Sequence, residues 1–301
     1  MDIDKKILKR LDEWEAEEGG LPKSLELYRR LLRIQSSAKL RIGPHGPGLS
    51  PEVISNRMST GYPVLEFDDL SIDWGLLWGI FEEVSSLLSS YSEVLCEVPE
   101  NLKDSSSCPA FLKEAIRAWF EGSQSPLWIA VSGVNEAHWE FILHATLRPF
   151  LTRRCEALLN FVNQELWRRG YCPICGGSPD FAFLDKERGA RWLLCSRCDA
   201  AWLFQRIGCP YCGNQNQDTL AYFTDDKGLY RLYVCEQCRN YLKAIDLRQT
   251  EGEVWLPLER ILTLDIDTQA QKDGYSPGVK AKRGEGMKMQ HDLTASTKEE
   301  G

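Results

Sequence analysis

The sequence lacks the long apolar runs that membrane-spanning and exported chains need. No stretch of its 301 residues approaches the roughly 18 apolar residues of a membrane-spanning helix. The first residues, Met-Asp-Ile-Asp-Lys-Lys, form no apolar signal core. We therefore expect a cytoplasmic protein with no membrane span.

The motifs of common catalytic sites are missing as well. The sequence contains no Gly-rich phosphate loop, no nucleophile elbow and no His-Glu-x-x-His. His138 and His144 share one predicted helix, but their spacing does not stack them on one face as metal ligands at i and i+4 would be. The sequence thus predicts a protein that is not an enzyme.

Positive charge is also scarce. The net charge of −8 at pH 7 argues against nonspecific binding to nucleic acid or to anionic membranes. Residues 172–248 contain ten Lys and Arg against nine Asp and Glu, so no strongly basic region is expected there. A ribbon that binds nucleic acid would be expected to show a basic face. Nucleic-acid binding is therefore the least favoured function.

What the sequence has in quantity is cysteine in a regular pattern. Eight of the eleven cysteines form four Cys-x-x-Cys pairs within 67 residues. The pairs are Cys172/Cys175, Cys195/Cys198, Cys209/Cys212 and Cys235/Cys238. Two such pairs around a short hairpin supply four thiolates for one tetrahedral metal ion, and this arrangement occurs twice. The other cysteines, which are expected to be small buried apolar residues, are Cys96, Cys108 and Cys155.

The two cysteine units repeat one another. Each begins with a Cys-Pro-x-Cys-Gly turn, continues with two strand-like stretches around a polar turn, and closes with the second Cys-x-x-Cys. Equivalent cysteines lie 37 residues apart at the start of the units and 40 at the end. Proline fixes one dihedral angle of the tight turn, and glycine permits the positive φ that lets backbone N–H groups point at sulfur.

Metal is expected to decide whether these units fold. They span 27 and 30 residues, and chains below about 40 residues usually need disulfides, metals or partners. Zinc and iron both suit four thiolates, and four protein ligands leave no open position for metal-assisted hydrolysis. Pairing within each unit is favoured, because each hairpin returns its second turn to the first. Pairing of Cys172/Cys175 with Cys209/Cys212 stays open.

The first 170 residues are predicted to be helical. Apolar residues recur at helical spacing before Gly19-Gly20 and again between residues 22 and 40. A short helix capped by Ser50 is expected, followed by helices at about 69–90, 107–122 and 134–169, the last bent or broken near Pro149. Later in the chain we expect a strand shared between the cysteine units at 202–207, another at 241–245, and a closing element at 256–265.

The predicted fold class is therefore α+β, with an all-α domain followed by two tandem zinc-ribbon units. The helical domain covers residues 1–170, the first four-cysteine ribbon 171–206, and the second ribbon with its closing segment 207–275. The polar, Gly- and Lys-rich residues 276–301 are expected to form a disordered tail.

Stretches around the cysteines carry a pattern more specific than metal-ligand spacing. They are Cys172-Pro-Ile-Cys-Gly, Leu194-Cys-Ser-Arg-Cys-Asp-Ala-Ala-Trp202, Arg206-Ile-Gly-Cys-Pro-Tyr-Cys-Gly213 and Cys235-Glu-Gln-Cys-Arg-Asn-Tyr-Leu-Lys-Ala-Ile245. With the later Leu262-Thr-Leu-Asp-Ile-Asp-Thr and Asp273-Gly-Tyr275, they resemble the formate dehydrogenase accessory protein family, FdhE. The specific match covers about a third of the chain.

The resemblance implies a rubredoxin-like C-terminal part that can hold iron, with the eight cysteines as ligands. It also implies a cytoplasmic assembly factor that binds the catalytic subunit of a molybdenum- or tungsten-dependent formate dehydrogenase and does not itself oxidise formate. Two other functions stay open, a redox protein in which ribbon iron carries electrons and a zinc ribbon that binds nucleic acid. The sequence leaves the choice of Fe or Zn, the client and the oligomeric state undecided.

Overall fold

The computed structural model describes residues 2–43, 46, 48–91, 108–122 and 136–278. Contacts divide the chain into two compact units, residues 1–46 with 67–154, and residues 47–66 with 155–301. Compactness does not test where independently folding domains end, so the domain ranges given above stay predictions. Within the described ranges, no helix combines the length and apolar character needed to cross a bilayer.

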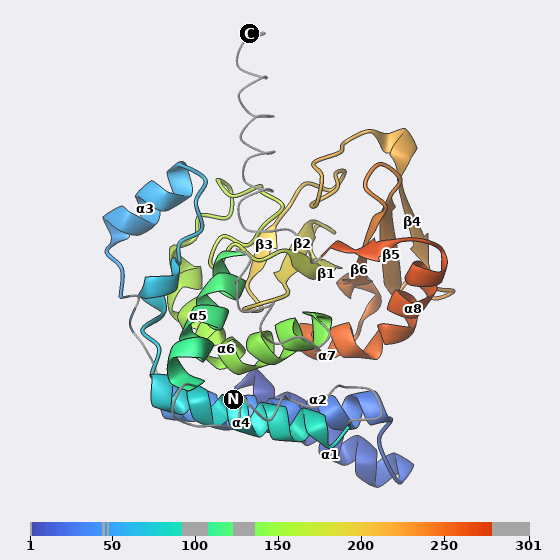
Figure 1. The fold of residues 1–301 in the computed structure, drawn as a ribbon. Helices are drawn as coiled ribbons and strands as arrows, with labels where there is room; N and C mark the ends of the chain where they lie inside the picture. The colour runs from blue at the N-terminus through green and yellow to red at the C-terminus, as the bar shows by residue number, and fades with distance from the viewer. Residues whose placement is uncertain (1, 44–45, 47, 92–107, 123–135, 279–301) are drawn as a thin grey trace. The chain divides into compact units, whose positions relative to one another are not determined.

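The first unit is helical in the residues that are described. Its elements are α1 (Ile3–Glu18), α2 (Lys23–Ile42), the 3₁₀ turn η1 (Phe67–Leu70), α4 (Trp74–Ser89), α5 (Cys108–Glu121) and most of α6 (Glu136–Leu158). Figure 1 shows α1, α2 and α4 lying side by side. The predicted helices are present, but α6 ends at Leu158, well before residue 169, and Pro149 lies inside it.

Local sequence signals account for the ends of these helices. α1 ends at Gly19, whose φ of 73° is in the left-handed region that glycine adopts easily. The Asp73 side chain accepts a hydrogen bond of 2.9 Å from the Leu76 N–H and so caps the start of α4. These signals act within one turn of the chain, which is why they are legible in the sequence.

Apolar packing and two buried cations hold α1 against α2. The most buried core side chains of the unit include Ile7, Leu11, Leu32, Leu77 and Phe120. On α2, Arg29 is 5% exposed and pairs with Glu15 of α1 at 2.6 Å, while Lys39 is 4% exposed and pairs with Asp4 of α1 at 3.0 Å. Because a buried charge without its partner is strongly unfavourable, the two pairs fix the register of the helices.

The second unit is built around one mixed sheet. Its strands are β1 (Pro179–Leu184), β2 (Arg191–Cys195), β3 (Ala201–Leu203), β4 (Leu220–Thr224), β5 (Tyr230–Cys235), β6 (Asn240–Asp246) and β7 (Ser276–Pro277). The strand order is β3-β2-β1-β6-β5-β4, with β7 beside β6 (Figure 1). The helical N-terminal region followed by two strand-rich cysteine units confirms the predicted α+β class.

The two ribbons are joined by parallel pairing of β1 with β6, in which Phe181 lies opposite Lys243. The prediction of a shared strand at residues 202–207 is wrong, because β3 ends at Leu203 and pairs with β2 alone among the described strands. The strand expected at 241–245 is confirmed as β6. A parallel partner 62 residues away in the chain cannot be predicted from the residues around either strand.

A segment from the N-terminal half of the chain covers the first ribbon. It contains α3 (Pro51–Ser59), whose start is capped by Ser50 as predicted. The N–H groups of Val64 and Leu65 donate to the carbonyls of Pro173 and Ile174, both at 2.8 Å, and both donor residues are 0% exposed. The first Cys-x-x-Cys turn is therefore paired with backbone from far away in the sequence.

Two short helices close the second ribbon. They are α7 (Leu256–Leu262) and α8 (Leu264–Lys272), where the sequence predicted one element. The buried Lys243 Nζ donates to Asp267 at 2.5 Å and to the Thr263 carbonyl at 3.2 Å, and the Tyr241 hydroxyl donates to Asp267 at 2.8 Å. The Tyr241-Leu-Lys motif thus fastens α8 to β6.

The first residues of the segment predicted to be disordered, 276–301, form a strand. Ser276–Pro277 form β7, and the Ser276 N–H donates to the Arg239 carbonyl at 2.8 Å. Residues 279–301, for which disorder was expected, lie outside the described residues.

Asp246 offers a direct test of the sheet's polar packing. Its carboxylate is 0% exposed and accepts hydrogen bonds from Arg231 at 2.7 Å and Arg248 at 2.6 Å. We expect Asp246→Asn to lower the free energy of unfolding at pH 7 by about 3 kcal/mol, because it removes the buried charge that the guanidinium groups of Arg231 and Arg248 share. Urea denaturation of the metal-loaded protein, followed by tryptophan fluorescence, measures this difference.

The difference should also be constant between about pH 6 and 8. The hydrogen bond from Arg248 is the main cause that holds the pKa of Asp246 below its usual value. A carboxylate with a lowered pKa stabilises the fold above its unfolded pKa of about 3.9 and loses that contribution only as pH falls further. As a control, Asp226→Asn in the exposed β4–β5 turn should change stability by no more than about 0.5 kcal/mol. Equal effects of the two substitutions would contradict the assignment.

Candidate metal centres

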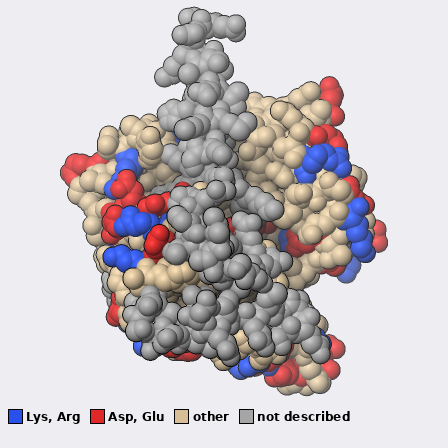
Figure 2. Space-filling model, viewed as in Figure 1, with Lys and Arg blue, Asp and Glu red and all other residues tan. Residues whose placement is uncertain are grey.

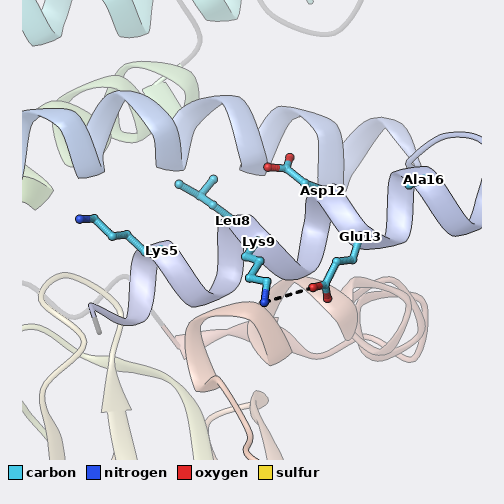
Figure 3. Close-up of a pocket in the computed structure, with 6 residues that line it drawn as sticks. All are labelled: Lys5, Leu8, Lys9, Asp12, Glu13 and Ala16. Carbon is cyan, nitrogen blue, oxygen red and sulfur yellow. Dashed lines mark ion pairs between the residues drawn. The ribbon is translucent and has the colours of Figure 1, made fainter.

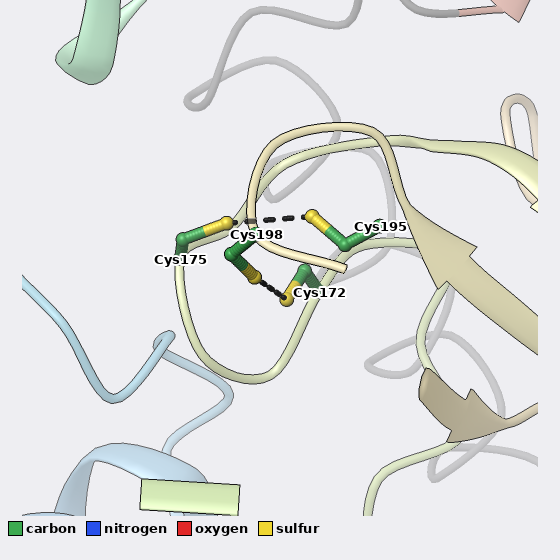
Figure 4. Close-up of side chains that lie close together, drawn as sticks. All are labelled: Cys172, Cys175, Cys195 and Cys198. Carbon is green, nitrogen blue, oxygen red and sulfur yellow. Dashed lines mark hydrogen bonds between the residues drawn. The ribbon is translucent and has the colours of Figure 1, made fainter. Parts of the chain in front are cut away.

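The structure gathers the eight predicted cysteines into two separate clusters. One contains Cys172, Cys175, Cys195 and Cys198, and the other contains Cys209, Cys212, Cys235 and Cys238. Within each cluster all four sulfur atoms lie within 4.8 Å of one another. Figure 4 shows the first cluster, in which the two Cys-x-x-Cys turns face each other. The sulfurs are therefore grouped within each ribbon, and the alternative grouping across the ribbons is not found.

The sulfur spacing fits a metal ion better than a disulfide. The closest pairs are 3.6 Å for Cys172 and Cys198, 3.5 Å for Cys175 and Cys195, 3.6 Å for Cys209 and Cys238, and 3.7 Å for Cys212 and Cys235. A disulfide bond would bring two sulfurs to about 2.05 Å. Metal–sulfur bonds of about 2.3 Å in a tetrahedron give sulfur separations of about 3.8 Å. The donor set and its spacing therefore suit four-coordinate Zn or Fe.

A left-handed residue follows the second cysteine of every turn. Gly176 and Gly213 both have φ of 74°, as expected for the two Cys-Pro-x-Cys-Gly turns. The other two turns reach the same conformation without glycine, with φ of 58° at Asp199 and 57° at Arg239. This conformation costs a non-glycine residue about 1–2 kcal/mol. The left-handed conformation is tolerated at these positions because it helps to close the four-sulfur cluster.

Backbone donors point at the sulfurs of the first cluster. The N–H of Ile174 lies 3.4 Å from the Cys172 sulfur, and the N–H of Arg197 lies 3.3 Å from the Cys195 sulfur. Such donors stabilise thiolate over thiol. They therefore offset part of the cost of burying thiolates in this cluster.

Burial shapes the protonation of the first cluster. All four side chains are at most 2% exposed, and burial raises the pKa of Cys172, Cys195 and Cys198 well above the usual value. Burial also acts on Cys175, but hydrogen bonds from the other three thiols hold the pKa of Cys175 well below its usual value. Four buried thiolates need a cation among them, so metal binding must be coupled to proton release.

The second cluster is more open. Cys212 and Cys238 are partly exposed, whereas Cys209 and Cys235 are buried. Burial raises the pKa of Cys238 to about 11. For Cys235, burial is outweighed by donors, chiefly the Asn214 amide at 3.5 Å from its sulfur, and the pKa falls to about 7. The two clusters share a ligand set but differ in solvation.

An arginine of α7 contacts a Cys-x-x-Cys turn of the first cluster. The sequence did not predict this contact. Arg260 donates to the Cys195 carbonyl at 3.0 Å and to Asp199 at 2.9 Å, and it pairs with Asp180 at 2.9 Å. It thereby holds the turn that contains a left-handed aspartate. The signal available in the sequence was an arginine within a short apolar closing element, which is too common to indicate this contact.

The remaining cysteines and histidines lie outside the clusters where they are described. Cys155 is 5% exposed, as predicted for a small buried residue. Its thiol is hydrogen-bonded to Cys198, and this hydrogen bond is one of the causes that raise the pKa of Cys198. His144 stacks on Trp119 with ring centroids 5.7 Å apart. Cys96 and the side chain of Cys108 lie outside the described residues.

A hollow on α1 does not resemble a binding site. It has a volume of about 560 Å³ and is lined by Lys5, Leu8, Lys9, Asp12, Glu13 and Ala16. Figure 3 shows that all six side chains come from one helix, with Lys9 paired to Glu13. Because this ion pair is largely exposed, it stabilises the helix by no more than a few tenths of a kcal/mol.

Each cluster should lose its own ion independently when one ligand is removed. We expect Cys172→Ser and Cys235→Ser each to reduce the metal content from two ions to one per chain, because three thiolates hold the ion less tightly than four and each small ribbon lacks a sufficient core. Native mass spectrometry counts the ions, and limited proteolysis locates the ribbon that opens.

A matched control is Cys155→Ser, which removes a buried thiol outside both four-cysteine clusters and keeps a hydroxyl in its place beside Cys198. This variant should keep both ions. Full metal content and native protease resistance in Cys172→Ser or Cys235→Ser would contradict the ligand assignment.

Comparison with known proteins supports the resemblance that the motifs around the cysteines predicted. A family model described as FdhE, central domain, matches residues 171–206. A protein named "Protein FdhE homolog" from Aquifex aeolicus is 35% identical over 148 residues, which are 48% of this chain and 51% of that protein. A protein of the same name from Shewanella sp. is 27% identical over 151 residues, 50% of this chain and 45% of that protein. The matched segment therefore spans about half the length of these relatives.

Longer matches extend the similarity over most of the chain. A "Protein FdhE homolog" from Pseudomonas aeruginosa is 28% identical over 271 residues, covering 83% of this chain and 80% of that protein. The crystal structure of the FdhE protein from Pseudomonas aeruginosa has the same fold, with a TM-score of 0.57, 23% identity and coverage of 94% of this chain and 95% of that one. The resemblance to the FdhE family that the motifs predicted is thus confirmed by the matched central domain, by the relatives and by the shared fold.

Proposed function

We propose that this chain is an accessory protein for the maturation of formate dehydrogenase and is not itself an enzyme. The observation that carries the proposal is the FdhE-type pair of four-cysteine ribbons joined in a single sheet. Four protein ligands around each ion leave no position for a substrate. Such a scaffold is suited to presenting a rigid surface to another protein.

The client in this proposal is the catalytic subunit of a molybdenum- or tungsten-dependent formate dehydrogenase. The chain would bind it in the cytoplasm, before the enzyme is complete. Free thiols within 4.8 Å of one another, in place of disulfides, are in keeping with a reducing compartment.

The ligands in this proposal are the eight clustered cysteines, and the ions are Fe or Zn. Metal bound there would supply folding free energy, about 10–16 kcal/mol for structural zinc in small peptides, which is as large as the stability of an ordinary domain. The chain's own residues would contribute the thiolates, the N–H donors that stabilise them, and the left-handed turns that orient them.

A redox protein is the second candidate. It is favoured by one observation, the partial exposure of Cys212 and Cys238 in the second cluster. Iron held by four thiolates can change its oxidation state, and an exposed cluster edge is accessible to an electron donor. Purification without oxygen followed by metal analysis separates the two candidates, since a chain that carries only zinc cannot transfer electrons at these sites.

Nucleic-acid binding stays the least favoured function. On the face drawn in Figure 2, the Lys and Arg side chains of the described residues lie beside Asp and Glu side chains. Interleaved charges of this kind attract a phosphate backbone weakly. Salt-dependent retention on heparin tests this function directly.

The maturation proposal predicts both a physical and a genetic link to formate dehydrogenase. A tagged chain recovered from its native cell should retain the catalytic subunit, and a deletion strain should lose formate dehydrogenase activity. Activity should return with the wild-type chain but fall to background with a Cys172→Ser, Cys235→Ser double variant, because both ribbons would then be open.

The Cys155→Ser chain serves as the matched control and should restore activity. Normal formate dehydrogenase activity in the deletion strain, together with no recovered subunit, would refute the proposal.

A further inference from the structure

An arginine-lined pocket lies next to the second cysteine cluster. Its volume is about 300 Å³, at the lower limit of the roughly 300–1,000 Å³ typical of small-molecule sites. The walls come from the start of β2, from β4, β5 and β6, and from the connection at residues 206–211. The lining residues include Arg191, Arg206 and Arg231 but no Asp or Glu. This composition distinguishes the pocket from the mixed charge of the ribbons.

Arg191 places a positive charge in the wall with no carboxylate against it. The residue is 3% exposed, and its guanidinium group donates to the carbonyls of Gln205 and Gly208, both at 2.6 Å. It also lies over the rings of Phe204 and Tyr233, each 5.2 Å from the ring centroid. Carbonyls and ring faces orient the guanidinium but do not neutralise it. A buried cation of this kind favours an anion nearby.

Arg231 and Arg206 add donors that the described residues leave unused. The Nε of Arg231 is buried without a hydrogen-bond partner, while its Nη2 donates to Asp246. Asp246 is already shared with Arg248, so two guanidinium groups meet one carboxylate. Arg206 is exposed at the rim and makes no hydrogen bond or ion pair with the described residues.

The neighbouring cysteine cluster accounts for only part of this charge. Cys209 and Cys235 also line the pocket, and four thiolates around a divalent ion carry a net charge of about −2. That charge attracts Arg191 and opposes the effect of burial, which lowers the pKa of Arg191. It gives no hydrogen-bond acceptor to Arg206 or to the Nε of Arg231.

We propose that this pocket binds a small organic molecule through a phosphate group. Arg206 and Arg231 contact the phosphate oxygens, and the buried Arg191 adds positive charge in the pocket wall. Guanidinium groups match phosphate geometry with paired donors, and a phosphate offers three strong acceptor oxygens and close to two negative charges. The exposed ring of Tyr222 also lines the pocket, packs against the Arg231 guanidinium at 5.1 Å and offers an aromatic surface to an organic group beside the phosphate. The site is independent of the proposed role in maturation.

Calorimetric titration of the metal-loaded protein with AMP, at constant ionic strength, tests the proposal. Saturable binding of AMP is expected, with no binding of adenosine, which lacks the phosphate. Arg206→Gln should weaken AMP binding by about tenfold or more, because each lost charge-assisted hydrogen bond is worth at least that factor. Arg206 is exposed and makes no hydrogen bond or ion pair with the described residues, so this variant should fold normally.

The matched control is Arg188→Gln, which removes an exposed arginine of the first ribbon that does not line the pocket. Its AMP affinity should equal that of the wild type. The proposal is overturned if AMP shows no saturable binding, if adenosine binds as tightly as AMP, or if acetate displaces AMP as strongly as inorganic phosphate does. It is also overturned if Arg206→Gln and Arg188→Gln have equal effects, since that would indicate general charge attraction.

Discussion

The closure of each four-sulfur cluster is the constraint on which the second unit depends. A two-stranded hairpin is marginally stable in water by itself, and each ribbon consists of little more than one hairpin with a Cys-x-x-Cys turn at each end. A metal ion bound by those turns would connect the start of the first strand to the end of the second.

Pairing of β1 with β6 makes the ribbons interdependent. The closing helices reinforce this dependence, because Arg260 of α7 binds the turn at Cys195 in the first ribbon while Asp267 of α8 binds Lys243 in the second. Arg260 and Lys243 are both largely buried and both bound to carboxylates, so neither contact can be released without exposing or isolating a charge. Opening one ribbon should therefore loosen the other ribbon even while its own ion remains bound.

The elements that the sequence predicts well are those whose causes are local. The helix start at Ser50, the end of α1 at Gly19, and the glycines after Cys175 and Cys212 each follow from a few adjacent residues. Grouping of the cysteines within each ribbon also follows from a short hairpin. The resemblance to the FdhE family likewise rests on motifs that are each contiguous in the chain.

The features that the sequence does not predict depend on contacts between distant segments. Val64 and Leu65 pair with the turn at Pro173, and the β1–β6 pairing replaces the shared strand expected at residues 202–207. The left-handed Arg239 carries no local signal, because arginine adopts that conformation only where its surroundings enforce it. The arginine pocket likewise forms from residues on four strands and one connection, so no window of sequence contains it.

The unequal burial of the two clusters assigns them different chemical capacities. A change of oxidation state alters the net charge of a four-thiolate iron site by one unit, and such a change is least favourable where solvent is excluded. The first cluster is entirely buried and has Arg260 behind it, so its charge state is strongly fixed by the protein. In the second cluster, water reaches Cys212 and Cys238 and can reorganise around a changed charge. If iron occupies both clusters, the second is therefore the one whose surroundings accommodate a change of oxidation state.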